Sequence, residues 1–209
     1  MRNALLLLGP TGVGKTPLGD ALERDGLAGQ RCHHFDFGAQ LRAVNAGHAR
    51  PEGLTDADRA FVRKVLTTGA LLENETFYIA ERILRGFMAR RCRGEHDLIV
   101  MNGLPRHVDQ ARDVDRLVDI RTVVQLACSP DVAAARIRLN SGGDRTGRTD
   151  DALPAIERKI ALFQSRTLPL LDHYKSRGVY MAIVSVGVST TPRDVVRHLE
   201  REYPLEGDS

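Results

Sequence analysis

A glycine-rich segment near the start of the chain has the residue types needed to hold a polyphosphate. It reads GPTGVGKT over residues 9–16 and matches the pattern G-x-x-x-x-G-K-[ST] at every defined position. Glycines let successive backbone N–H groups converge on an anion, the lysine adds a mobile positive charge, and the hydroxyl can bind Mg²⁺. The residues predicted to bind ATP through this loop are Gly9, Gly12, Val13, Gly14, Lys15 and Thr16, with Thr16 also a metal ligand.

The segments on either side of this loop have the patterns that the motif requires. Residues 4–8 form an unbroken apolar run, which is typical of a buried strand. Residues 18–27 have helical spacing of apolar side chains, and Pro17 suits the first turn of a helix. An ordinary glycine-rich turn would explain the composition, but it would not explain both the motif and its context.

The rest of the chain alternates between predicted strands and predicted helices. Further strands are expected at residues 33–37, 97–101, 122–128 and 179–186. Helices are expected at residues 40–50, 56–68, 73–91, 109–117, 130–139 and 151–177, the last kinked at Pro169, and a final helix begins at Pro192. This alternation predicts an α/β fold with a parallel sheet covered on both faces, and ligands in such folds bind at the carboxyl ends of the strands.

Composition narrows the class of protein. The 209 residues suit one α/β domain, and a net charge of +3 is too small to argue for a nucleic-acid partner. The three cysteines are far apart, which disfavours a disulfide framework or a zinc site and fits a reducing cytoplasm. The apolar run at the N-terminus is too short to span a membrane, so we expect a cytoplasmic protein without a membrane partner.

Three further motifs follow the phosphate-binding loop in a fixed order. They are GAQLR at 38–42, NGLPRHVDQ at 102–110 and GRTDD at 147–151, and TLPLLDHY comes later on the last long helix. This set resembles the adenylate kinase family and its nucleoside monophosphate kinase relatives, including UMP/CMP kinases, over nearly the whole chain.

The resemblance implies a fold, a division of the chain and a reaction. The fold is the P-loop NTPase fold, with a five-stranded parallel sheet and helices on both faces. Residues 1–209 would form a single kinase domain with a monophosphate-binding insertion at about 36–72 and a short, zinc-free lid at about 137–149. The implied reaction is Mg·ATP + NMP ⇌ ADP + NDP in a monomer, with AMP the first candidate acceptor and CMP or UMP as alternatives.

The resemblance also assigns roles on the acceptor side. Arg42 and Arg106 match the arginines that hold the phosphate of the monophosphate, and Gln110 matches the glutamine that reads the edge of adenine. The acceptor site would be completed by Phe37, Gly38 and Gly103. On residue type alone, Arg42 and Gln110 could equally be ordinary surface side chains.

On the ATP side, Arg136 and Gly187 match positions beside the ATP base. Arg148, on the lid, and Lys159 would act with Lys15 on the transferring phosphates, although Arg148 could instead pair with its neighbouring aspartates. Asn102 would hold magnesium through water. Phosphoryl transfer to an anionic phosphate oxygen needs such cations and in-line positioning, not a strong general base.

The sequence departs from the family pattern at positions that matter for magnesium and for the acceptor. Asn102 and Ala39 stand where the family has acids that organise the water shell of magnesium, and Phe37 replaces a small hydroxyl residue. These departures keep two other hypotheses open. One is a kinase of this fold with a non-nucleotide metabolite as acceptor, and the other is a weakly active nucleotide-binding sensor or regulator.

The adjacent histidines His33 and His34 raise the question of a metal site. Neighbouring side chains on a strand point to opposite faces, so the two rings cannot readily share one ion. We interpret both as structural.

Overall fold

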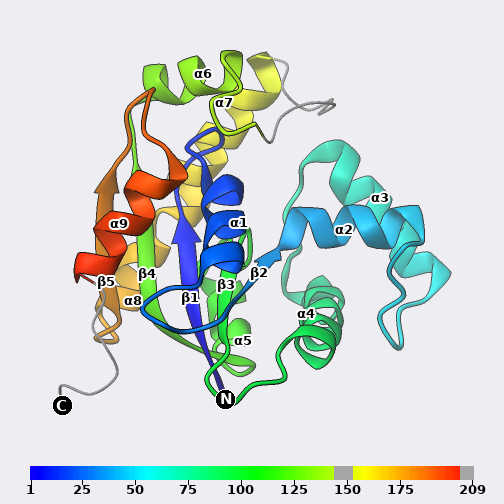
Figure 1. The fold of residues 1–209 in the computed structure, drawn as a ribbon. Coiled ribbons are helices and arrows are strands. Elements are labelled where there is room, and N and C mark those ends of the chain that lie inside the picture. The colour runs from blue at the N-terminus through cyan, green and yellow to red at the C-terminus, as the bar shows by residue number, and fades with distance from the viewer. Residues whose placement is uncertain (144–152, 203–209) are drawn as a thin grey trace.

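The computed structural model describes residues 1–143 and 153–202, and its centre is a five-stranded sheet (Figure 1). The strand order is β2-β3-β1-β4-β5, and every neighbouring pair is parallel. The strands are β1 (Arg2–Leu8), β2 (Cys32–Asp36), β3 (Leu98–Asn102), β4 (Val118–Ala127) and β5 (Tyr180–Ser185). The predicted α/β P-loop fold with a five-stranded parallel sheet is confirmed.

Helices cover both faces of the sheet, because alternate side chains of each strand enter two separate cores. On β1, Ala4, Leu6 and Leu8 enter one core, and Leu5 and Leu7 enter the other. The first core is covered by α4 (Phe77–Arg91), α5 (Val108–Val114) and α8 (Leu170–Lys175). The second core is covered by α1 (Lys15–Asp25) and α9 (Pro192–Glu202).

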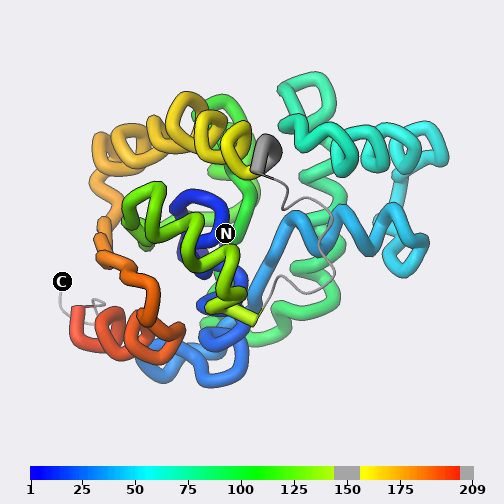
Figure 2. Tube along the Cα trace, turned by 90° about the horizontal axis from the view of Figure 1, so that it is seen from above, coloured from blue at the N-terminus to red at the C-terminus, as the bar shows by residue number. Residues whose placement is uncertain are grey.

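Two helices, α2 (Phe37–Ala46) and α3 (Asp56–Thr68), extend beyond β2 on the opposite side of the molecule from α9 (Figures 1 and 2). Each has a well-formed N-cap. The carboxylate of Asp36 accepts from the N–H of Ala39 at 2.8 Å, and Thr55 and Asp58 form a capping box. Asp58 also accepts a hydrogen bond from the hydroxyl of Tyr78, which ties α3 to α4.

The helix after the phosphate-binding loop packs closely on β2. A side chain at Gly19 would meet the ring of His34 at 2.3 Å, so only glycine allows α1 to lie against this strand. The Nδ1 atom of His34 lies 2.8 Å from Asp20 Oδ1, whereas His33 faces Asp97 on the other side. The two histidines therefore point apart, as predicted.

The long helix expected at 151–177 is not continuous, and this prediction was wrong in detail. It consists of α7 (Leu153–Leu162), a π-helical turn η2 (Phe163–Thr167) and α8. Pro169 has no N–H and its ring would crowd the carbonyl one turn back, so the chain widens before it. The N–H of Leu168 accordingly donates to the carbonyl of Phe163, five residues earlier.

The remaining elements follow the predicted order. The helix expected at 73–91 begins with a 3₁₀ turn, η1 (Asn74–Thr76), before α4, and α6 (Pro130–Arg138) follows β4. The final helix begins at Pro192 as predicted, and the hydroxyl of Thr191 accepts from the N–H of Asp194 at its start. Within the described residues, no helix combines the length and hydrophobicity that a membrane span would need.

Candidate functional site

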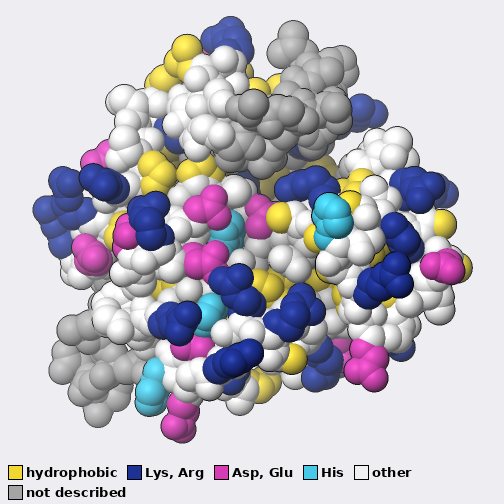
Figure 3. Space-filling model, turned by 45° about the vertical axis from the view of Figure 1, so that its right-hand side comes forward, with side chains coloured by type: hydrophobic (Ala, Val, Ile, Leu, Met, Phe, Trp, Pro, Cys, Tyr) yellow, Lys and Arg dark blue, Asp and Glu magenta, His cyan; other side chains and the backbone are white. Residues whose placement is uncertain are grey.

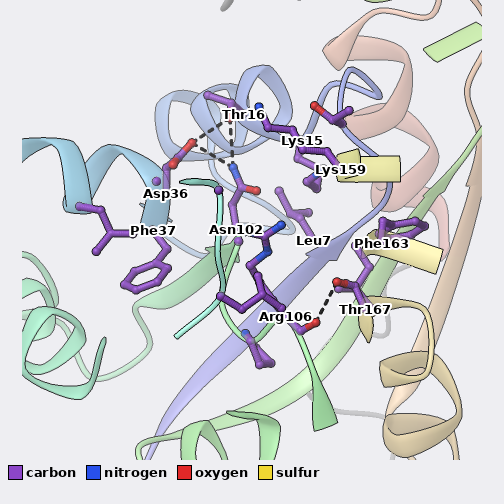
Figure 4. Close-up of a pocket in the computed structure, with 18 of the residues that line it drawn as sticks. Leu7, Lys15, Thr16, Asp36, Phe37, Asn102, Arg106, Lys159, Phe163 and Thr167 are labelled. Atoms are coloured by element: carbon purple, nitrogen blue, oxygen red, sulfur yellow. Dashed lines mark hydrogen bonds between the residues drawn. The ribbon is translucent and has the colours of Figure 1, made fainter. Parts of the chain in front are cut away.

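A cavity of about 270 Å³ lies at the carboxyl ends of β1, β2 and β3. Its walls come from the phosphate-binding loop, α2, the segment after α3, the loop after β3, and α7 with η2 (Figure 4). The structure brings thirteen of the sequence-predicted residues to this one cavity: Gly9, Gly12, Gly14, Lys15, Thr16, Phe37, Gly38, Arg42, Asn102, Gly103, Arg106, Gln110 and Lys159.

The phosphate-binding loop has a backbone shape that requires its glycines. Gly12 and Gly14 have φ of +84° and +105°, and a side chain at Gly12 would meet Ile137 at 2.5 Å. Lys15 begins α1, and its ammonium donates to the carbonyls of Gly9 and Pro10 at 2.6 and 2.9 Å. The N-terminus of α1 therefore reaches the cavity with its partial positive charge and this lysine side by side.

An acid that the sequence reasoning missed lies directly beside the loop. Asp36, the last residue of β2, accepts a hydrogen bond from the hydroxyl of Thr16 at 2.8 Å and from the side-chain amide of Asn102 at 3.1 Å. Asn102 also donates to the hydroxyl of Thr16 at 3.1 Å, so the three side chains form a closed triangle (Figure 4). The signal available in the sequence was an aspartate at the carboxyl end of a predicted strand.

The oxygen atoms of this triangle suit a hard cation. Thr16 and Asp36 supply hydroxyl and carboxylate oxygens, the ligand types that Mg²⁺ prefers. Among the residues that the structure describes, no three His, Cys, Asp or Glu side chains gather into a group that could hold a metal alone. Mg²⁺ is usually held by one or two carboxylates together with the phosphates of a substrate, so these residues fit a magnesium ion that arrives with a nucleotide.

Two arginines contribute positive charge to the same cavity. Arg106 follows β3, and its side chain points toward the end of the cavity where Asn102 and Lys15 lie (Figure 4). Burial lowers the pKa of the Arg106 guanidinium, and no described acidic side chain is paired with it. Arg42, from α2, lines the cavity as well. A largely buried guanidinium without an acid creates a strong preference for a bound anion.

The opposite wall is formed by α7 and η2. Lys159, Phe163 and Thr167 all line the cavity. The hydroxyl of Thr167 donates to the carbonyl of Arg106 at 2.8 Å, which fixes the loop after β3 against the π-helical turn. The neighbouring Arg158 is exposed and does not line the cavity, so Lys159 is the residue of this pair that contributes to the wall.

Gln110 is 1% exposed, so it is not an ordinary surface glutamine. Its Oε1 accepts from the N–H of Arg106 at 2.8 Å and its Nε2 donates to the carbonyl of Leu72 at 2.7 Å. Both ends of the amide thus bind backbone groups that border the cavity. Recognition of an acceptor base by this side chain stays a prediction, and it would require these hydrogen bonds to change.

The residues predicted near the ATP base form a separate cluster outside the cavity lining. Arg136 is 4% exposed and donates through Nη1 to the carbonyls of Gly187 at 2.7 Å, Val188 at 3.1 Å and Thr190 at 2.9 Å. Its Nε donates to the carbonyl of Gly12 at 3.3 Å. Arg136 and Gly187 therefore lie together and brace the phosphate-binding loop, while Val13 is packed in the core. Their contact with a base stays a prediction.

Arg148 and the rest of the predicted lid from residue 144 onward lie outside the described residues. On the face drawn in Figure 3, basic side chains are interspersed with acidic ones. That face carries mixed charge, in keeping with the small net charge of the chain.

Comparison with known proteins agrees with the motifs. No protein-family model matches the chain. The chain is 28% identical over 192 residues to an adenylate kinase of Xylella fastidiosa (strain M23), which covers 88% of this chain and 91% of that protein. It is 28% identical over 194 residues to an adenylate kinase of Synechococcus sp. (strain WH7803), with coverage of 90% and 92%. An adenylate kinase of Prochlorococcus marinus (strain MIT 9313) is 25% identical over 192 residues, with coverage of 90% and 92%. The resemblance inferred from GAQLR, GLPR and GRTDD is confirmed.

Proposed function

Because the chain is related to the adenylate kinases over nearly its whole length, we propose that it is a phosphotransferase that moves the γ-phosphate of ATP to a nucleoside monophosphate. AMP is the first candidate acceptor, and CMP and UMP are the alternatives. The observation that carries the proposal is the shared cavity, where the phosphate-binding loop with Lys15 meets the largely buried guanidinium of Arg106.

The donor side rests on the phosphate-binding loop. Its backbone N–H groups and the N-terminus of α1 bind the β- and γ-phosphates. Lys15 leaves the carbonyls of Gly9 and Pro10 and turns to those phosphates, exchanging two neutral acceptors for anionic ones. Mg²⁺, when bound with ATP, neutralises charge on the phosphates, and Thr16 supplies a hydroxyl to it.

The acceptor side rests on the two arginines. Arg42 and Arg106 hold the phosphate of the monophosphate in the same cavity, so that its oxygen faces the terminal phosphorus of ATP. The attacking oxygen is already anionic, so the chain supplies positioning and positive charge and no general base. Lys159 on α7 and Arg148 on the proposed lid at 137–149 stabilise the charge that spreads over the transferring group. Residues 36–72, with α2 and α3, form the proposed acceptor-binding insertion.

The test is acceptor-dependent formation of ADP from Mg·ATP. Purified protein is assayed against AMP, CMP, UMP, GMP and their deoxy forms, and AMP is expected to give the highest kcat/KM. Arg106→Met is expected to raise the KM for the acceptor while leaving the binding of an ATP analogue nearly unchanged. Folded protein that binds the analogue but phosphorylates none of these acceptors contradicts the proposal.

A second candidate, a kinase with a non-nucleotide acceptor, is supported by the environment of the acceptor end. Gln110 is committed to backbone groups, and the nearby wall is apolar, with Phe37, Leu41, Val65, Leu66, Leu71 and Leu72 lining the cavity. A thermal-shift screen of phosphorylated and hydroxylated metabolites, in the presence of an inert ATP analogue, separates this candidate from the first. A metabolite that raises Tm where every monophosphate fails favours the second candidate.

The hypothesis of a weakly active sensor was motivated by missing acids at Ala39 and Asn102. Asp36 supplies a carboxylate beside Thr16, which removes most of that motive. The sensor hypothesis would regain support if the wild type proved slow and its rate rose in Asn102→Asp.

A further inference from the structure

We propose that Asp36 is the acid of the magnesium site, and that it takes the place of the acid missing at position 102 on the neighbouring strand. The inference rests on the proposed function, because it concerns magnesium bound with ATP. It concerns a residue that the motif-based assignment did not include, and it explains how the chain can have an asparagine where an acid was expected.

The sheet register places the two positions side by side. β2 and β3 are parallel, and Asp36 is the direct register partner of Asn102. Register partners in a parallel pair point to the same face, with their strands about 4.8 Å apart. A carboxylate moved from one position to the other therefore reaches nearly the same region, and the Asp36 Oδ2 and Asn102 Nδ2 atoms are 3.1 Å apart.

Asp36 is held in place at both of its oxygens. Oδ1 accepts from the N–H of Ala39, because Asp36 is the N-cap of α2. Oδ2 accepts from the hydroxyl of Thr16 at 2.8 Å. The hydroxyl proton is thereby directed to Asp36, and Asn102 donates to the same oxygen, which leaves one lone pair of the Thr16 oxygen available for a cation. A carboxylate in this position acts on magnesium through Thr16 and through the waters of the ion.

The environment of position 102 explains why an amide suits it. The amide nitrogen of Asn102 lies within 3.1 Å of acceptors on Thr16 and Asp36, and 3.4 Å from Nε2 of His34. The pairing of His34 Nδ1 with Asp20 favours a ring whose Nε2 is an acceptor. An aspartate at position 102 would place a second carboxylate beside that of Asp36, and the Thr16 hydroxyl already donates to Asp36. Two adjacent carboxylates do not readily ionise together.

The test is a cycle of four proteins: wild type, Asp36→Asn, Asn102→Asp, and the double variant with both changes. Isothermal titration calorimetry measures the affinity for a non-hydrolysable ATP analogue without metal and at saturating Mg²⁺, and the ratio of the two affinities is the magnesium gain. Asn is as good an N-cap as Asp, so Asp36→Asn retains α2. Asp109→Asn, an exposed acid at the start of α5, is the matched control.

In Asp36→Asn we expect the magnesium gain to fall about 10- to 100-fold, the usual effect of losing an outer-shell partner of a metal. Metal-free binding stays equal or becomes tighter, because one negative charge near the phosphates is removed. The double variant recovers most of the gain, Asn102→Asp alone does not exceed wild type, and Asp109→Asn is unchanged. Structural damage would instead weaken metal-free binding as well.

An unchanged magnesium gain in Asp36→Asn overturns the inference, as does a double variant no better than Asp36→Asn. Because the titration contains no acceptor, its result is independent of the acceptor panel. If the wild type phosphorylates AMP and Asp36→Asn keeps the full magnesium gain, only the inference is refuted. If Asp36→Asn loses the magnesium gain but the wild type phosphorylates no monophosphate, only the proposed function is refuted. Wild type that does not bind the analogue with Mg²⁺ contradicts both.

Discussion

Gln110 and Leu72 are joined by a buried hydrogen bond of 2.7 Å from the side-chain amide to the backbone carbonyl, which connects α5 to the segment that follows α3. The same side chain accepts from the N–H of Arg106, so one glutamine sets the spacing between two walls of the cavity.

Replacing Gln110 by alanine should therefore lower stability as well as alter the site. The N–H of Arg106 loses its partner, whereas the carbonyl of Leu72 keeps Nε2 of His107 at 3.1 Å. One unsatisfied group costs about 1–3 kcal/mol, so we expect the free energy of unfolding to fall by about that amount. Urea unfolding measures this, with Gln40→Ala on α2 as the control, which should change it by less than about 0.5 kcal/mol. Wild-type stability combined with lost selectivity between acceptor bases would show that Gln110 reads the base instead.

The charge of Arg106 should lower the stability of the anion-free protein and favour the binding of an anion. Its guanidinium is largely buried without an acidic partner, and burial lowers its pKa. Replacing it by methionine removes a desolvated charge but keeps much of the volume, so Arg106→Met should raise the free energy of unfolding by about 1–2 kcal/mol in anion-free buffer.

The same variant should lose part of the stabilisation that wild type gains from added phosphate, while the phosphate-binding loop with Lys15 provides the rest. Thermal unfolding with and without phosphate checks both effects, and Arg112→Met, an exposed arginine on α5, is the control. A variant less stable than wild type in anion-free buffer would mean that the Arg106 charge already has a stabilising partner.

Arg136 should contribute more to holding the phosphate-binding loop in place than to contact with the base of ATP. Its side chain donates to four carbonyls, one in the phosphate-binding loop and three after β5. Arg136→Lys cannot reproduce this fork, and we expect a loss of about 2–4 kcal/mol in unfolding free energy together with weaker binding of an ATP analogue. Arg138→Lys, at an exposed position two residues later on α6, should be near neutral in urea unfolding and in calorimetry. Wild-type stability in Arg136→Lys would contradict the bracing role.

The link between α3 and α4 should weaken in acid. The hydroxyl of Tyr78, followed by the backbone and hydroxyl of Thr55, holds the pKa of Asp58 below its usual value. A lowered folded pKa gives stability that is present above the unfolded pKa of about 3.9 and is lost as pH falls through the folded value.

The wild type should thus be more stable than Asp58→Asn at pH 7, and the difference should shrink below about pH 4. Urea unfolding at several pH values measures it, with the exposed Asp56→Asn as the control. A difference that stays constant down to pH 2 would exclude the charge of Asp58 as its cause.

Hydrophobic periodicity and motif spacing predicted the order and type of the main elements. The run at residues 4–8 and the DLIVM segment form the adjacent strands β1 and β3, and the phosphate-binding loop lies between β1 and α1 as expected. These features are local, because a strand, a glycine-rich turn and a helix cap each depend on a few neighbouring residues.

The parts that were missed depend on contacts between distant segments. The approach of Asp36 to Asn102 follows from the register of β2 with β3, which a single sequence does not encode in any one segment. The burial of Gln110 depends on the carbonyl of Leu72, thirty-eight residues earlier. The π-helical turn was obscured because a proline within a helical pattern predicts a kink but not which hydrogen bond replaces the lost one.

The hydroxyl of Thr167 rests on the carbonyl of Arg106, while Lys159 lies two turns earlier on the helix that leads into the same π-helical turn. A rotation or shift of α7 that moves Lys159 would therefore be transmitted to the backbone of Arg106 through one hydroxyl group. Binding of a phosphate group beside Lys159 would then change the affinity of the site at Arg106 for the acceptor phosphate. Donor and acceptor would therefore bind as thermodynamically coupled ligands and not as independent ones.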